Sequence, residues 1–240
     1  MNPPSDDVIR RVDRIVEELV ADVSRSIISR SMLEASNQRV LQAPLAGIQT
    51  PGAEGHKIIQ ASLRMGLCLE LARVFDVGRR PIPKQDKASL PILAYYLVQP
   101  DVRQRLVARS GPYANLCEAE IDACLARWTA FNANSSDAAA LDRMQQLRDW
   151  RIAHNIFEKE PELPTHRGIF RLVSVAASIT CHAQGAISPG TKTDFKWMAR
   201  SYRRAGNDFW ARFIEGAKAE FEREGCDPKP PGAAVRTNRS

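Results

Sequence analysis

The spacing of apolar residues is the feature that most restricts how this chain can fold. Near the N-terminus, apolar residues recur every three or four positions: Val8, Val12, Ile15, Leu19, Val23 and Ile27. This spacing gathers the side chains on one face of an α-helix. A half-buried strand would show alternating apolar and polar residues, many of them β-branched, between two turn signals. No stretch of the sequence has this pattern. The sequence therefore predicts an all-α fold.

Prolines, glycines and polar clusters divide the chain into expected helices. The expected ranges are 6–43, 55–76, 88–98, 101–108, 113–132, 135–156, 165–184 and 191–224. The 55–76 helix is apolar almost all round, which predicts a place in the middle of a bundle. Ser135 or Ser136 is expected to cap one helix and Thr165 another. Residues 6–224 are expected to form one domain, between disordered segments 1–5 and 225–240.

Composition and charge narrow the expected surroundings. No run approaches 18 uninterrupted apolar residues and no secretory signal follows the N-terminus, so we expect a cytoplasmic protein that does not span a membrane. Five cysteines without a Cys-x-x-Cys pair indicate neither a disulfide framework nor a zinc site. Without a Gly-rich phosphate loop or metal-ligand spacing, no cofactor or metal is predicted. The net charge of +6 allows a polyanion partner.

The segment 135–156 combines helical spacing with reactive side chains. Its apolar face consists of Leu141, Met144, Leu147, Ile152 and Ile156. Arg148 falls near the centre of that face, where an arginine needs a partner, because a buried charge without one costs about 3–5 kcal/mol. Asp149 follows it directly, and His154 lies six positions on. We select Arg148, Asp149 and His154 as candidate catalytic residues.

Two interpretations of Arg148 and His154 remain open. On a straight helix the two side chains point about 120° apart, so two copies of the chain would be needed to bring them to one groove. Such a homodimer would suit RNA cleavage, with histidine moving protons and arginine holding phosphate. In the structural alternative, His154 is favoured by the helix dipole, and Arg148 pairs with a core carboxylate such as Glu70 or Asp76.

Basic residues elsewhere are candidates for RNA binding. Lys192, Lys196, Arg200 and Arg203 form one stripe of the last expected helix, beside a second stripe that contains aromatic residues. Arg151, on the 135–156 helix, belongs to the same candidate set. Basic residues next to aromatic rings can bind nucleic acid. The alternative is an ordinary amphipathic helix whose cationic face is solvated.

One short run resembles a known family. The sequence LRDWRIAHN (147–155) is similar to the signature of the HEPN superfamily, an arginine and a polar residue followed four to six positions later by histidine. The preceding run LRMGLCLELARVFD (63–76) resembles the AbiU-like abortive-infection branch. The resemblance covers roughly residues 55–215 in helix order, and the nine-residue motif is its specific part.

The resemblance implies an all-α, HEPN-like helical bundle with additional flanking helices. It further implies a dimeric, metal-independent endoribonuclease of toxin or phage-defence type, with an antitoxin or defence partner. Arg148 would clamp phosphate, Asp149 would orient the site, and His154 would be the general acid and base. Ile156 replaces the tyrosine of adenylylated members, which argues against a nucleotidyltransferase antitoxin. Because some members are non-catalytic, the alternative is a module that binds RNA or a protein.

Overall fold

The computed structural model describes residues 6–38, 51–76, 78, 81–153, 162 and 164–223, and these residues contain helices and turns but no strand. The all-α class is therefore confirmed for the described part of the chain. Its α-helices are α1 (Asp6–Ser36), α3 (Pro51–Val74), α4 (Leu90–Leu97), α5 (Pro100–Arg109), α6 (Ala114–Asn132), α7 (Ser135–Ala153), α8 (His166–Ile187) and α9 (Phe195–Arg223). Two 3₁₀ turns, Ile82–Lys84 and Gly111–Tyr113, lie between them.

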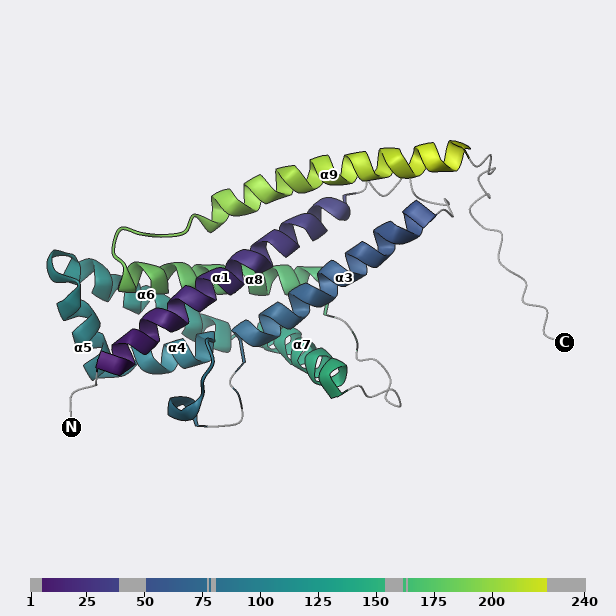
Figure 1. Cartoon of the computed structure of the whole chain (residues 1–240). Helices are drawn as coiled ribbons and strands as arrows, with labels where there is room; N and C mark the ends of the chain where they lie inside the picture. Colours follow the sequence, from purple (N-terminus) through teal and green to yellow (C-terminus); the bar gives the residue numbers. More distant parts are fainter. Residues whose placement is uncertain are drawn as a thin grey trace.

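Helices α1 and α8 form the centre of the core. The apolar residues predicted to share one face of α1 are buried, among them Val12, Leu19 and Val23. Helical spacing predicts Ile169 and Leu172 on the inner face of α8, and both are fully buried. Figure 1 shows α1 crossing the molecule with α8 behind it and α9 along one edge, and α1 packs against α3, α4, α8 and α9.

Helix α3 occupies the middle of the bundle only along its second half. There Leu67, Leu71 and Val74 are buried, but Ile58 in the first half is 59% exposed. The first half extends beyond the α1–α8 core toward the end of α9 (Figure 1), where the Gly52 N–H donates to a carboxylate of α9 at 3.2 Å. The prediction of a central helix is therefore wrong for its first half.

Side-chain hydrogen bonds explain why α1 ends earlier than the sequence predicts. The helix stops at Ser36 rather than near residue 43. Gln60 of α3 donates to the Ser36 carbonyl at 3.1 Å, and the Ser36 hydroxyl donates to the Leu33 carbonyl at 2.8 Å. The first bond satisfies the Ser36 carbonyl, whereas the Leu33 carbonyl also accepts from the Asn37 N–H at 3.1 Å. Helix α3 starts at Pro51, four residues before the expected Gly55, because proline suits the first helical turn.

The short helices and α6 follow the expected order. A proline near the start of each short helix fixes its N-terminal end, and Pro100 is the first residue of α5. Helix α6 covers the expected range. Of the side chains that helical spacing predicts on its inner face, Ile121 is buried but Leu116 is 43% exposed. The helix also buries Cys117 and Cys124 in the core.

Side-chain caps fix the first residues of α8 and α9. The Thr165 hydroxyl accepts from the Gly168 N–H at 3.2 Å, which confirms the predicted cap of α8. That helix continues to Ile187 instead of ending near residue 184, and α9 begins at Phe195 instead of Thr191. Asp194 sets the later start, because its carboxylate accepts from the Trp197 N–H at 2.8 Å.

Trp210 fastens α9 to α1. Its indole is fully buried, and Nε1–H donates to the Met32 carbonyl of α1 at 3.0 Å. The approach of the two helices is close, since a Cβ at Gly206 would lie 3.0 Å from the Ala35 Cβ. His56 of α3 meets the indole edge-on, with ring centroids 4.8 Å apart. Trp210 thus joins three helices that are distant in sequence.

Two expectations fall partly or wholly outside the described residues. Within the described part, no helix is long and apolar enough to cross a membrane. The segments expected to be disordered, 1–5 and 225–240, are not among the described residues, so their disorder stays a prediction.

Candidate functional site

Helix α7 carries Arg148 and is fixed at its start by an asparagine. Asn134, rather than the expected Ser135 or Ser136, caps the helix, because its side-chain oxygen accepts from the Ser136 and Asp137 N–H groups, both at 3.1 Å. The Asp137 carboxylate is itself buried and pairs with Arg171 of α8 at 2.6 Å. This pair ties the first turn of α7 to α8.

The buried face of α7 leaves Arg148 at the margin of the core. Met144 and Leu147 are fully buried, whereas the Arg148 side chain keeps 23% of its surface exposed. Its Nη1 lies 3.3 Å from Asp76 Oδ1, just beyond the end of α3. Its Nε and Nη2 lie 2.9 and 2.8 Å from Asp149 Oδ1. Both edges of the guanidinium are therefore occupied.

Asp76 is one of the two carboxylates proposed as partners in the structural interpretation of Arg148. The other, Glu70, instead accepts a long hydrogen bond of 3.4 Å from Ser26. Burial lowers the pKa of Arg148, but the hydrogen bond to Asp149 and the charge of Asp76 outweigh burial and raise it. Arg148 is consequently cationic at neutral pH.

Asp76 is the centre of a small polar network. The sequence predicted Asp76 as a possible partner of Arg148 but did not indicate the other members of the network. Lys87 donates to its Oδ2 at 2.6 Å, and the Gly78 N–H donates to its Oδ1 at 3.0 Å. Gly78 has a φ of +69°, and a Cβ there would lie 2.5 Å from Gln85. A glycine is thus required at this turn. The signal available in the sequence was the basic, proline-containing segment after residue 76.

The network also sets the protonation of Asp76. Burial raises the pKa of this carboxyl, but the hydrogen bonds from Lys87 and Gly78 and the charge of Arg148 together bring it below its ordinary value. In the unfolded chain the pKa returns to about 3.8. Stability from this carboxylate is therefore present above the unfolded pKa and is lost as the pH falls through the folded one.

We expect Asp76→Asn to destabilise the protein by about 1–2 kcal/mol at pH 7, because hydrogen bonds to charged groups are strong but this site is partly exposed to solvent. The difference from wild type should shrink as the pH falls below about 3.8, the pKa in the unfolded chain, and through the lower pKa of the folded protein. Urea unfolding at pH 7 and pH 3 measures both effects. Asp149→Asn is the matched control, since Asp149 is 63% exposed and should cost less than 1 kcal/mol. Equal losses in the two variants would contradict this account.

Two candidate residues fall outside the description, one from the catalytic set and one from the RNA-binding set. His154 is not among the described residues, and the side chain of Arg151 is not described either. Helix α7 is described through Ala153, the residue before His154. The structure therefore shows Arg148 and Asp149 together and leaves their relation to His154 as a prediction.

The second candidate set does not form the single helical stripe that the spacing predicts. Because α9 begins only at Phe195, Lys192 lies before the helix. It pairs there with Glu120 of α6 at 2.5 Å. Arg203 pairs with Glu34 of α1. Lys196 and Arg200 are exposed, and no hydrogen bond or ion pair joins either of them to another described residue. Two of the four cations are thus available for an anionic partner.

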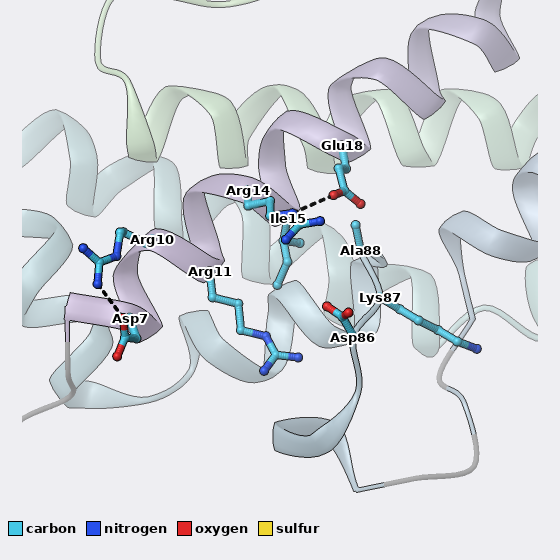
Figure 2. Close-up of a pocket in the computed structure, with 9 residues that line it drawn as sticks. All are labelled: Asp7, Arg10, Arg11, Arg14, Ile15, Glu18, Asp86, Lys87 and Ala88. Carbon is cyan, nitrogen blue, oxygen red and sulfur yellow. Dashed lines mark hydrogen bonds and ion pairs between the residues drawn. The ribbon is translucent and has the colours of Figure 1, made fainter.

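A basic pocket of about 330 Å³ lies between the start of α1 and the segment 86–88 (Figure 2). Arg10 pairs with Asp7 at 2.5 Å, and a second arginine of the same helix pairs with a glutamate at 3.0 Å. Figure 2 shows Arg11 extending from α1 into the space beside Asp86, and its guanidinium lies 5.5 Å from the Tyr96 ring centroid. Carboxylates balance most of the positive charge here, so this pocket is the weaker site for an anion.

Among the described residues, no group of three histidine, cysteine, aspartate or glutamate side chains is placed to hold a metal ion. Comparison with known protein families, with curated proteins and with solved structures gives no match.

Proposed function

We propose that this protein binds RNA and cleaves it at the end of α7 by attack of a 2′-hydroxyl on the adjacent phosphate. The observation that carries the proposal is the position of Arg148. Its guanidinium is held at the margin of the core by Asp76, while its other edge meets the exposed Asp149. An exposed ion pair is weak, so a phosphate can take the place of Asp149 at that edge.

The proposed chemistry divides the work between two side chains. His154 removes the proton of the 2′-hydroxyl or protonates the leaving 5′-oxygen. Arg148 stabilises the negative charge that grows on the phosphate as the new P–O bond forms. The reaction releases a 5′-hydroxyl and a 2′,3′-cyclic phosphate, and none of its steps uses a metal or cofactor. The similarity of LRDWRIAHN to the HEPN signature supports the same assignment.

A second copy of the chain forms part of the proposal. On one straight helix, side chains six positions apart point about 120° away from each other. If α7 continued straight, Arg148 and His154 of the same protomer would therefore diverge. A two-fold axis near the end of α7 would place both pairs in one groove. The family resemblance adds a toxin or phage-defence role, with an antitoxin or defence partner, to this proposal.

A specific observation also favours a second function, a non-catalytic module that binds RNA or a protein partner. Both edges of the Arg148 guanidinium are occupied by carboxylates of the same chain, as expected of an arginine that only holds α7 to α3. In that case exposed cations such as Lys196 and Arg200 would bind RNA without cleaving it.

One experiment separates the two functions. Purified protein is incubated with labelled single-stranded RNA, with the same RNA carrying 2′-O-methyl groups, and with EDTA in parallel. The nuclease should cleave the first RNA whether or not EDTA is present, leave the methylated RNA intact, and produce 2′,3′-cyclic phosphate ends. Binding of both RNAs without cleavage would reject the nuclease in favour of the binding module. Light scattering at micromolar concentration tests the dimer in the same preparation.

A further inference from the structure

A cavity of about 680 Å³ opens between α1, α6, α8 and the start of α9. This volume is within the range of about 300–1,000 Å³ that small-molecule sites occupy. Part of its wall is apolar and built mostly of small side chains, namely Val173, Ala177, Cys181, Phe195 and Ala199. Such a wall can cover the flat face of an aromatic ligand.

Positive groups surround the apolar wall. The basic side chains that line the cavity are Arg30, Arg127, His182, Lys192 and Lys196. Among the described lining residues, Asp194 is the one carboxylate, and it caps α9. No hydrogen bond or ion pair joins Arg127 or Lys196 to another described residue. These two cations are thus available to a bound anion, and neither must first give up a carboxylate.

A carboxylate orients the ring of His182, which lines the same cavity. Its Nδ1 lies 2.8 Å from Glu120 Oε2, and Lys192 donates to the other oxygen at 2.5 Å. Burial raises the pKa of Glu120, but the hydrogen bonds from Lys192 and His182 outweigh burial and lower it. Because Glu120 is ionised, Nδ1 is the nitrogen that carries the proton, and Nε2 remains for another partner.

We propose that this cavity binds one phosphorylated nucleoside, either a free mononucleotide or one nucleotide of an RNA strand. The phosphate is held by Arg127 and Lys196, and the base lies against Ala177 and Ala199. The Ser178 hydroxyl, which has no hydrogen bond to another described residue, suits the polar edge of a base better than an alkyl chain. The proposal rests on the RNA-binding part of the proposed function and adds a site remote from Arg148 in sequence.

The test measures binding of AMP, of adenosine and of a short 2′-O-methyl RNA, which cannot be cleaved by its own 2′-oxygen. Arg127→Gln and Lys196→Gln each remove one cation of the cavity. Arg204→Gln is the matched control, because Arg204 is exposed on α9, has no partner among the described residues and does not line the cavity. Melting temperatures of all variants verify that the fold is kept.

Each cavity variant should weaken AMP binding about tenfold or more, as the loss of a hydrogen bond to a charged group predicts, and Arg204→Gln should not. Adenosine, which lacks the phosphate, should bind weakly and equally to every variant. If only the methylated RNA shows the dependence on Arg127 and Lys196, the nucleotide belongs to a strand. If neither ligand distinguishes these variants from Arg204→Gln, the proposal is wrong.

Failure of the cavity and failure of the proposed nuclease give different results. AMP binding requires no cleavage, so a cavity that binds AMP in a protein without nuclease activity would reject cleavage alone. A protein that cleaves RNA but binds AMP and methylated RNA independently of Arg127 and Lys196 would reject the cavity alone.

Discussion

His154→Ala is expected to slow RNA cleavage by about 10²–10⁴-fold, the usual effect of removing a positioned general acid or base. The melting temperature should change little, because the proposed role of His154 is to move a proton. In the active protein, cleavage should depend on a group that titrates near pH 6.5, the ordinary range of histidine. Initial rates on labelled RNA between pH 5 and pH 8 measure both effects.

Arg148→Lys provides the second half of this test. A lysine keeps the charge but cannot reproduce the two-pronged hydrogen bonding of a guanidinium, so cleavage should remain low. Arg143→Lys is the matched control on the same helix, since Arg143 forms only a long, exposed ion pair of 3.8 Å with Glu162. Cleavage by that control should stay near the wild-type rate.

The structural interpretation forecasts the reverse pattern. If Arg148 only holds α7 to the end of α3, Arg148→Ala should lower the melting temperature sharply, while His154→Ala should leave cleavage unchanged. Stable variants with undiminished cleavage would end the assignment of catalysis to this site.

Trp210→Ala is expected to lower the free energy of unfolding by about 3–5 kcal/mol, the typical cost of truncating a large buried aromatic side chain. The indole is fully buried, and its loss would leave a cavity between α1, α3 and α9. It would also remove the indole N–H that donates to the Met32 carbonyl. Urea unfolding followed by circular dichroism measures the change.

The neighbouring aromatic residue is the control for Trp210. Phe209 precedes it on α9 and is 46% exposed, so Phe209→Ala should cost far less. Trp210→Phe should fall between the two, because it retains most of the apolar surface but loses the N–H group. Equal losses for Phe209→Ala and Trp210→Ala would mean that α9 is not fastened through this indole.

Helical periodicity was sufficient to predict the fold class and most helix positions, because it reports which face each segment buries. The buried face of α8 and its Thr165 cap were both readable, since each depends on residues within a few positions. The end of α1 was not, because Gln60, distant in sequence, satisfies the Ser36 carbonyl. The exposed first half of α3 was missed because composition does not reveal how far a helix extends beyond its neighbours.

The candidate site was also predictable only in part, because several of its contacts join residues that are distant in the sequence. The position of Arg148 on an apolar face indicated that it needs a partner, and Asp76 was one of two carboxylates proposed. The choice between them depends on where α3 ends. Lys87 joins the network through a turn at Gly78 that has no helical period. Likewise, the cavity containing Arg127 and His182 forms between helices far apart in the sequence.

His56 makes the stability of the region around Trp210 depend on pH. The ring is buried, its Nε2 has no hydrogen-bond partner among the described residues, and burial lowers its pKa. The unfolded chain therefore takes up a proton more readily than the folded one, and stability is lost as the pH falls below about 6.5. Mild acid should accordingly raise amide hydrogen exchange where α3 and α9 meet.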